Sequence, residues 1–214
     1  MLDSTPKRPR GAARPRAAGR RGPGVAAMRE AMSGRRDAVV RCDGCVGCCA
    51  SSQFVHIGPD EVETLAAIPR ALLFPAPGAP RGHVLLGYDA EGRCPMLAGD
   101  RCSIYEVRPR TCRTYDCRVF VASGVDVGDD KPLVARRARA WRVTIRTPED
   151  RRARDALRAA SEFLRERDAS LPEDVRPVTP TQRAVLSLAV QHLFTGSTTP
   201  PLSRVVAAIR RRRP

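Results

Sequence analysis

The sequence contains few aromatic residues and almost no lysine. Aromatic side chains make up 4% of the 214 residues, and lysine occurs only at Lys7 and Lys131. Large aromatic side chains supply much of the apolar area that a folded core buries. With so few of them, covalent or metal cross-links are expected to matter for the stability of the fold.

Long apolar stretches are also absent. No apolar run reaches the roughly 18 residues that a transmembrane helix needs, and residues 1–24 are basic without the apolar segment of a secretory signal. The sequence therefore predicts a cytoplasmic protein that does not contact a membrane.

The positive charge is concentrated at the two ends of the chain. The net charge is +15, of which residues 1–37 carry +7 and residues 201–214 carry +5, so that residues 38–200 carry only +3. Basic runs can bind nucleic acid, but no aromatic residue is interleaved with these arginines to stack on bases. The excess of arginine and alanine is explained more simply by a GC-rich genome. A nucleic-acid adaptor that binds through its tails is kept as the less favoured alternative.

The composition changes along the chain and predicts an α+β fold in four segments. Residues 1–37 lack a hydrophobic period, which predicts a disordered basic tail. Residues 38–125 hold every cysteine and predict a small, irregular, metal-stabilised domain. Residues 126–200 predict a strand and a mainly helical segment that packs on this domain. Residues 201–214 predict a short helix and a second basic tail.

Local patterns place individual elements within these segments. Short apolar runs and alternating residues predict strands, and apolar residues at intervals of three and four predict helices. The Gly58–Glu61 segment is typical of a helix start, followed by a buried stripe that includes Val62 and Leu65. The expected strands cover 54–57, 83–88 and part of 133–147 around Trp141, and the further helices cover 148–168, 181–194 and 202–212.

Eight cysteines fall within 76 residues of the chain. The first four follow the pattern Cys-x2-Cys-x2-Cys-Cys, a spacing that lets successive thiolates turn inward around one ion or cluster. Gly44 and Gly47 fit such loops, which need positive φ angles. The later four do not make a self-sufficient zinc finger, so the simplest closure pairs the two quartets across the fold. The eight candidate metal ligands are Cys42, Cys45, Cys48, Cys49, Cys94, Cys102, Cys112 and Cys117.

Three kinds of cross-link are open to these thiols. Disulfides are disfavoured in a reducing cytosol, and adjacent cysteines seldom share a regular bridge. Four thiolates make a common closed zinc site. The spacing of the first three cysteines also matches the start of bacterial ferredoxin runs, and Cys94-Pro95 has the form of their fourth ligand. We expect a zinc or iron centre, and an iron–sulfur cluster remains an open form of it.

The motifs together resemble those of a known family. The run of Cys42 to Cys49, Cys94-Pro95-x-Leu97, and the stretch Cys102-Ser-Ile-Tyr-Glu-Val-Arg-Pro-x2-Cys112-Arg-x-Tyr-x-Cys117 are similar to the YkgJ-type cysteine-cluster family. This resemblance covers about residues 40–120 and implies a zinc- or iron-chelating domain in which all eight cysteines are candidate ligands. It leaves the physiological partner and the metal open.

The same resemblance keeps an enzyme in view. A related cysteine cluster occurs in flagellin lysine N-methylases, which implies an iron–sulfur redox or methyl-transfer enzyme as an alternative. Residues 121–214 contain no glycine-rich loop after a predicted strand, the usual mark of a methyl-donor site. No catalytic residue is assigned, and whether the protein is an enzyme stays open.

A few other side chains are candidates near the cysteines. Arg108 is expected to position a turn, or to neutralise thiolate charge or pair with Asp116. His56 and His83 are each capable of replacing a sulfur ligand, although a surface or core role is expected for both.

Overall fold

A computed structural model describes residues 20–21, 24–35, 44–128 and 131–211. Cys42, most of the expected disordered tail over 1–37, and the last three residues of the C-terminal tail lie outside the described residues. No helix within the described ranges is long and apolar enough to cross a membrane. The elements are β1 (Arg20–Arg21), α1 (Val25–Met32), β2 (Val55–Ile57), α2 (Val62–Ala67), the 3-10 helix η1 (Arg70–Leu72), β3 (Leu73–Pro75), β4 (Val84–Leu86), β5 (Leu97–Ala98), β6 (Arg101–Cys102), α3 (Arg110–Thr114), α4 (Arg118–Ser123), α5 (Pro132–Arg139), β7 (Trp141–Arg142), α6 (Pro148–Glu166), η2 (Asp168–Ser170), η3 (Glu173–Val175), α7 (Pro180–Val190), η4 (Gln191–Phe194) and α8 (Leu202–Arg210).

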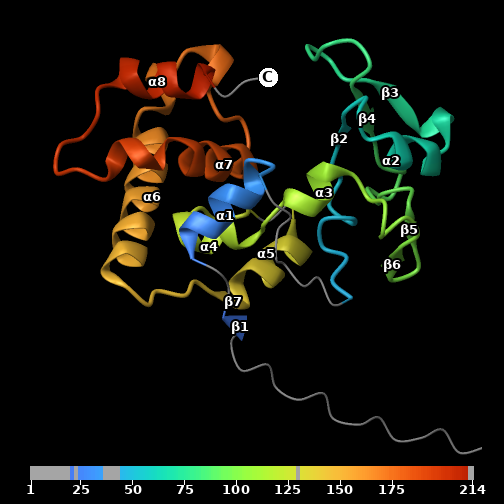
Figure 1. Cartoon of the computed structure of the whole chain (residues 1–214), viewed down its shortest axis with the longest axis horizontal. Helices are drawn as coiled ribbons and strands as arrows, with labels where there is room; N and C mark the ends of the chain where they lie inside the picture. Colours follow the sequence, from blue (N-terminus) through green and yellow to red (C-terminus); the bar gives the residue numbers. More distant parts are fainter. Residues whose placement is uncertain (1–19, 22–23, 36–43, 129–130, 212–214) are drawn as a thin grey trace, which may run out of the picture.

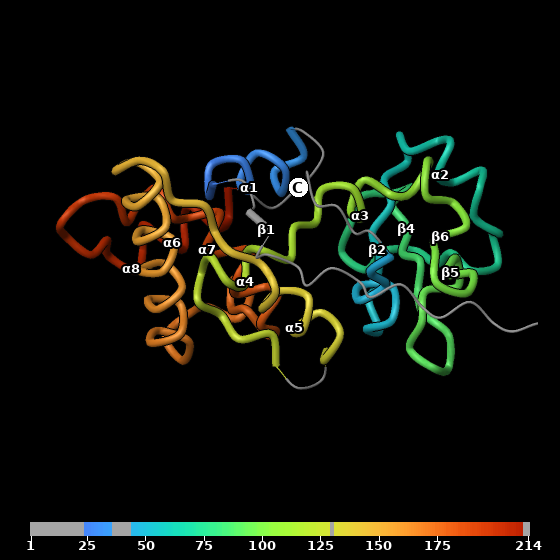
Figure 2. The backbone as a smooth tube through the Cα atoms, turned by 90° about the horizontal axis from the view of Figure 1, so that it is seen from below, coloured from blue at the N-terminus to red at the C-terminus, as the bar shows by residue number. Residues whose placement is uncertain are grey.

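These elements form two lobes that lie side by side (Figures 1 and 2). The cysteine lobe, residues 44–115, contains β2 to β6 and the short helices α2 and α3. The helical lobe contains α1 and residues 116–211, with α4 to α8. Helices and small antiparallel sheets thus occur together, and the predicted α+β class is confirmed.

The cysteine lobe is built on small sheets. One sheet has the strand order β2-β4-β3 with antiparallel pairing, and β5 and β6 form a separate antiparallel hairpin. Behind the first sheet, Ile57, Ile68 and Leu86 are almost fully buried. This core is small, so burial of apolar area alone supplies little of the stability of the lobe. The strands expected over 54–57 and 83–88 are confirmed as β2 and β4.

Helix α2 buries only part of the stripe that the sequence predicts, because Leu65 packs against the core and Val62 does not. Val62 is exposed, with 68% of its surface accessible, whereas Thr64 is buried. The Thr64 hydroxyl donates a 2.7 Å hydrogen bond to the carbonyl of Val107, which anchors the helix to the chain that leads into α3. A specific polar contact therefore sets the rotation of this short helix.

The helical lobe is organised around α6. Thr147 and Asp150 form a capping box at its start. Leu157, Ala160 and Leu164 lie at intervals of three and four and are fully buried, where α6 packs against α7 and η4. The helices expected over 148–168, 181–194 and 202–212 are confirmed as α6, α7 with η4, and α8.

The strand expected within 133–147 is largely replaced by a helix. Pro132 occupies the first turn of α5, and Val134, Ala135 and Ala138 bury one face of it. Only Trp141 and Arg142 form a strand, β7, which pairs in parallel with β1. The alternating apolar residues after Trp141 suggested a longer strand, but residues 143–147 form none.

A second difference lies in the segment before the cysteines. Within the range expected to be a disordered tail, residues 25–32 form α1, which buries Val25, Met28 and Ala31 on one face. Helix α1 packs against α4, α6 and α7. The cysteine lobe is consequently inserted between two parts of the helical lobe.

Candidate metal centre

The first cysteine segment runs through consecutive turns beside the helical lobe. The amide of Ala50 donates to the carbonyl of Val46 at 2.9 Å, and Ser51 donates through its hydroxyl to the Gly47 carbonyl. Gly44 has a φ of +74°, as expected for a tight loop. Gly47 does not have a positive φ. Glycine at this position lets the first cysteine segment lie close to α5, because a Cβ here would be 3.3 Å from the backbone of Leu133.

Two backbone hydrogen bonds hold this segment against the second cysteine segment. The amide of Cys94 donates to the carbonyl of Cys49 at 2.6 Å, and the amide of Ser52 donates to the carbonyl of Gly92 at 2.8 Å. Ser52 adopts a positive φ of 51°, which an ordinary residue adopts only where its surroundings require it. Cysteines 45 positions apart in the sequence are thereby fixed next to each other.

The β5–β6 hairpin brings a third cysteine to the same place. Leu97 donates through its amide to the carbonyl of Cys94 at 2.9 Å and pairs with Cys102 across the hairpin. The Ser103 amide donates to the carbonyl of Met96 at 2.8 Å. Cys94 and Cys102 thus belong to one compact turn-and-hairpin unit.

Helix α3 supplies the fourth member of this group. Desolvation by the surrounding protein, together with the like charges of nearby thiols, raises the pKa of Cys112 to about 12, while Arg108 opposes the shift. The Cys112 residue still reaches solvent, so its thiol is crowded without being enclosed. Burial, and then Cys102, also raise the pKa of Cys94. The thiols that interact in this way define the α3 thiol group: Cys49, Cys94, Cys102 and Cys112.

Two other cysteines lie near Tyr115, where the lobes meet. Burial raises the pKa of the Tyr115 hydroxyl, and Cys48 and Cys117 add to the shift while a hydrogen bond with Thr181 opposes it. Cys117 is buried and caps the start of α4, whereas Cys48 is exposed. Cys48 and Cys117 therefore lie close to Tyr115, at the start of α4.

The thiol side chains approach one another without forming a closed site. Within the described ranges, no three His, Cys, Asp or Glu side chains converge closely enough to hold a metal ion. Cys45, Cys94, Cys102 and Cys112 are free thiols. The donor set nevertheless suits zinc or iron, because thiolates are preferred ligands of both and a divalent cation stabilises the charged form that burial disfavours.

Charged side chains fix the positions of the cysteine-bearing helices. Arg108 donates to the carbonyl of Tyr105 at 2.6 Å and lies 4.0 Å from the centre of its ring. Asp116 pairs with Arg118 and not with Arg108, and both of its side-chain oxygens are engaged. Arg108 acts on the thiols by its charge alone, as it lowers the pKa of Cys112.

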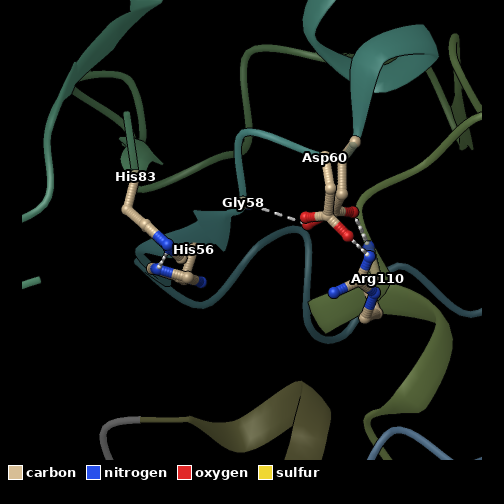
Figure 3. A network of polar contacts seen from close by, with 6 residues as sticks. His56, Gly58, Asp60, His83 and Arg110 are labelled. Carbon is tan, nitrogen blue, oxygen red and sulfur yellow. Dashed lines mark hydrogen bonds and ion pairs between the residues drawn. The ribbon is translucent and has the colours of Figure 1, made fainter. Parts of the chain in front are cut away.

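Glu61 ties the start of α2 to the start of α3. Its carboxylate accepts from the amide of Gly58 at 2.9 Å and from the amide of Arg110. The neighbouring Asp60 pairs with the Arg110 guanidinium, which lowers the pKa of Asp60 (Figure 3). These contacts hold the helix that carries Cys112 against the sheet. The sequence showed only acids in a helix first turn and gave no signal of these partners.

The structure also brings together two histidines that the sequence treats separately. Nδ1 of His83 lies 3.0 Å from Nε2 of His56, with the ring centres 4.9 Å apart (Figure 3). Both residues are partly buried. The two rings contact each other on one face of the sheet.

Comparison with known families agrees with the cysteine pattern. Residues 41–131 match the family model described as "CxxCxxCC: Putative zinc- or iron-chelating domain". The resemblance predicted from the cysteine motifs is thereby confirmed. The CxxCxxCC domain includes the whole cysteine lobe and extends through α4 to the start of α5. No curated protein and no solved structure matches the chain.

Proposed function

We propose that this protein is a metal-chelating module in which the eight cysteines hold zinc or iron as thiolates at two centres. The α3 thiol group, consisting of Cys49, Cys94, Cys102 and Cys112, supplies one centre. The remaining cysteines supply the other: Cys117 and Cys48 near Tyr115, with Cys45 and Cys42 from the same sequence motif. Four thiolates around each ion match the closed coordination of structural zinc sites.

The observation that carries this proposal is the gathering of the α3 thiol group. Three separate segments deliver its members, and backbone hydrogen bonds such as Cys94 to Cys49 hold two of these segments in register. Burial and the neighbouring thiols disfavour the thiolate form of Cys112, and a bound cation would offset that cost. Ion binding draws the sulfurs together and contributes to the folding of a lobe whose apolar core is small.

Metal analysis of the full chain, purified without oxygen, tests this proposal. We expect Cys112→Ser and Cys117→Ser each to remove about half of the bound metal, because each variant breaks a different four-thiolate centre. Ser103→Ala is the control, since it removes a side-chain hydrogen bond next to Cys102 without removing a thiol. Wild-type protein that carries no zinc or iron, or cysteine variants that keep all of it, would refute the proposal.

Visible absorption and the content of inorganic sulfide distinguish zinc from an iron–sulfur cluster. Tetrathiolate zinc is colourless, whereas iron–sulfur clusters absorb broadly in the visible range because of sulfur-to-iron charge transfer. A brown preparation with inorganic sulfide equal to its iron would assign a cluster. Zinc without visible absorption would assign closed structural centres.

A further inference from the structure

The histidine pair occupies a defined position on the sheet of the cysteine lobe. His56 lies in β2 opposite Leu85 of β4, and His83 directly precedes β4. In an antiparallel pair, a residue and the diagonal neighbour two positions along the partner strand project from the same face. The register therefore makes the two imidazoles neighbours on one face, and the 3.0 Å contact between their nitrogens follows from it.

The facing nitrogens have room for one proton between them. In the neutral pair, one ring nitrogen donates a hydrogen bond and the other accepts it. A divalent ion replaces that proton if the nitrogens separate slightly. Imidazole nitrogens bind zinc at about 2.0–2.1 Å, so two of them on one tetrahedral ion stand about 3.3–3.4 Å apart. The observed separation is within a few tenths of an ångström of this distance.

The surroundings leave the pair available to a cation. Figure 3 shows Asp60 turned toward Arg110, away from the two imidazoles. The charge of His83 helps to lower the pKa of Asp60, so the two side chains interact electrostatically. The position of the His56 backbone is fixed by a 2.7 Å hydrogen bond from the Thr111 hydroxyl to its carbonyl. Both rings are only partly buried, so water can complete a coordination shell.

We propose that His56 and His83 form a two-imidazole site for a divalent first-row transition metal ion, separate from the thiolate centres. Imidazole suits zinc, nickel and copper, whereas the thiolate groups prefer softer ions and clusters. With two protein ligands the site is weaker and exchanges faster than a closed four-thiolate centre. It would give the protein an exchangeable metal position on the same lobe.

Titration of the full-length, reduced and zinc-saturated protein with Ni²⁺ tests this site. Zinc already held by the thiols leaves the imidazoles as the available nitrogen donors, and side-chain NMR spectra report which histidine rings contact the paramagnetic ion. We expect the His56 and His83 signals to broaden together at one further equivalent of Ni²⁺. His192, the third histidine, lies in η4 of the helical lobe and should be unaffected.

Single substitutions decide between this site and nonspecific binding. We expect His56→Gln and His83→Gln each to weaken Ni²⁺ binding at least about tenfold, because one imidazole alone is a poor chelate. His192→Gln should bind like the wild type. Equal affinity in all four proteins, or broadening of His192 first, would overturn the proposal. The thiolate proposal is tested by a different measurement. The zinc content of the purified protein should be the same in the histidine variants as in the wild type.

Discussion

Asp116 and Arg118 form an ion pair inside the protein. The guanidinium Nη2 lies 2.6 Å from Oδ2, and Nε lies 2.7 Å from Oδ1, while the side chains are only 1% and 3% exposed. The amide of Arg118 also donates to Oδ1 at 3.0 Å, which closes a tight turn around the residue between them. That residue is Cys117, so the ion pair positions the cysteine that begins α4.

Loss of the arginine should be strongly destabilising. Arg118→Met leaves a buried carboxylate without its partner, and we expect the free energy of unfolding to fall by about 3–5 kcal/mol. Chemical denaturation measures this change. The double variant Asp116→Leu/Arg118→Met should recover part of the loss, because no charge is then left buried. Arg139→Ala breaks the exposed pair with Asp126 and should change stability by at most about 1 kcal/mol. Similar losses for Arg118 and Arg139 would contradict this account.

A second prediction concerns Glu61. Its side chain is 8% exposed and accepts hydrogen bonds from two backbone amides. Glu61→Ala leaves both amides without this acceptor, and we expect a loss of about 1–3 kcal/mol in unfolding free energy. Because one of these amides begins α3, Cys112 should also react faster with a thiol reagent. Glu63→Ala, on the exposed side of α2, is the matched control. Unchanged Cys112 reactivity in Glu61→Ala would show that α3 is held by other contacts.

Metal removal should affect the two lobes unequally. The cysteine lobe has a core of three almost fully buried residues, whereas α6, α7 and α8 share a larger apolar cluster. We expect a strong chelator to abolish hydrogen-exchange protection of the amides in β2, β4 and α3 while those of α6 remain protected. Added zinc should restore the lost protection. Equal loss of protection in α6 would mean that the lobes unfold as one cooperative unit.

Gly44 offers a test of loop geometry that leaves every thiol in place. Its φ of +74° is unfavourable for residues with a Cβ, although among the described residues no atom beyond its chain neighbours lies within 4 Å of the place a Cβ would take. Gly44→Ala should therefore lower stability by about 1 kcal/mol through backbone strain alone. Gly44→Asn should cost less, because asparagine tolerates this region better. Thermal unfolding of the metal-bound protein compares the two, and an alanine variant as stable as the wild type would exclude the strain.

The sequence predicts the parts of this structure that depend on local patterns. The apolar residues of α6 recur at intervals of three and four. This local periodicity is enough to predict the helix. The thiol motifs likewise identify the cysteine region. The proximity of Cys49 and Cys94 cannot be read from these motifs, because it depends on a backbone hydrogen bond between segments that are distant in the sequence.

Helix α1, the histidine pair and the buried ion pair depend on tertiary contacts, which no local sequence pattern indicates. Met28 stands in a stretch rich in basic and small residues, and only its burial against other helices makes α1 stable. His56 and His83 come together because two strands pair in one register, and a shift of one residue would place them on opposite faces. Asp116 and Arg118 are two positions apart, but nothing in the sequence distinguishes this buried pair from the many exposed ones.

The insertion of the cysteine lobe between α1 and α4 has a consequence for the chain as a whole. The contact between these helices makes residues 33–117 a closed loop, whose ends stay together whether or not its interior is ordered. Closing a flexible loop of this length costs on the order of 4 kcal/mol in chain entropy. An ion that orders this loop relieves part of that cost, and so strengthens the docking of α1 on α4, α6 and α7.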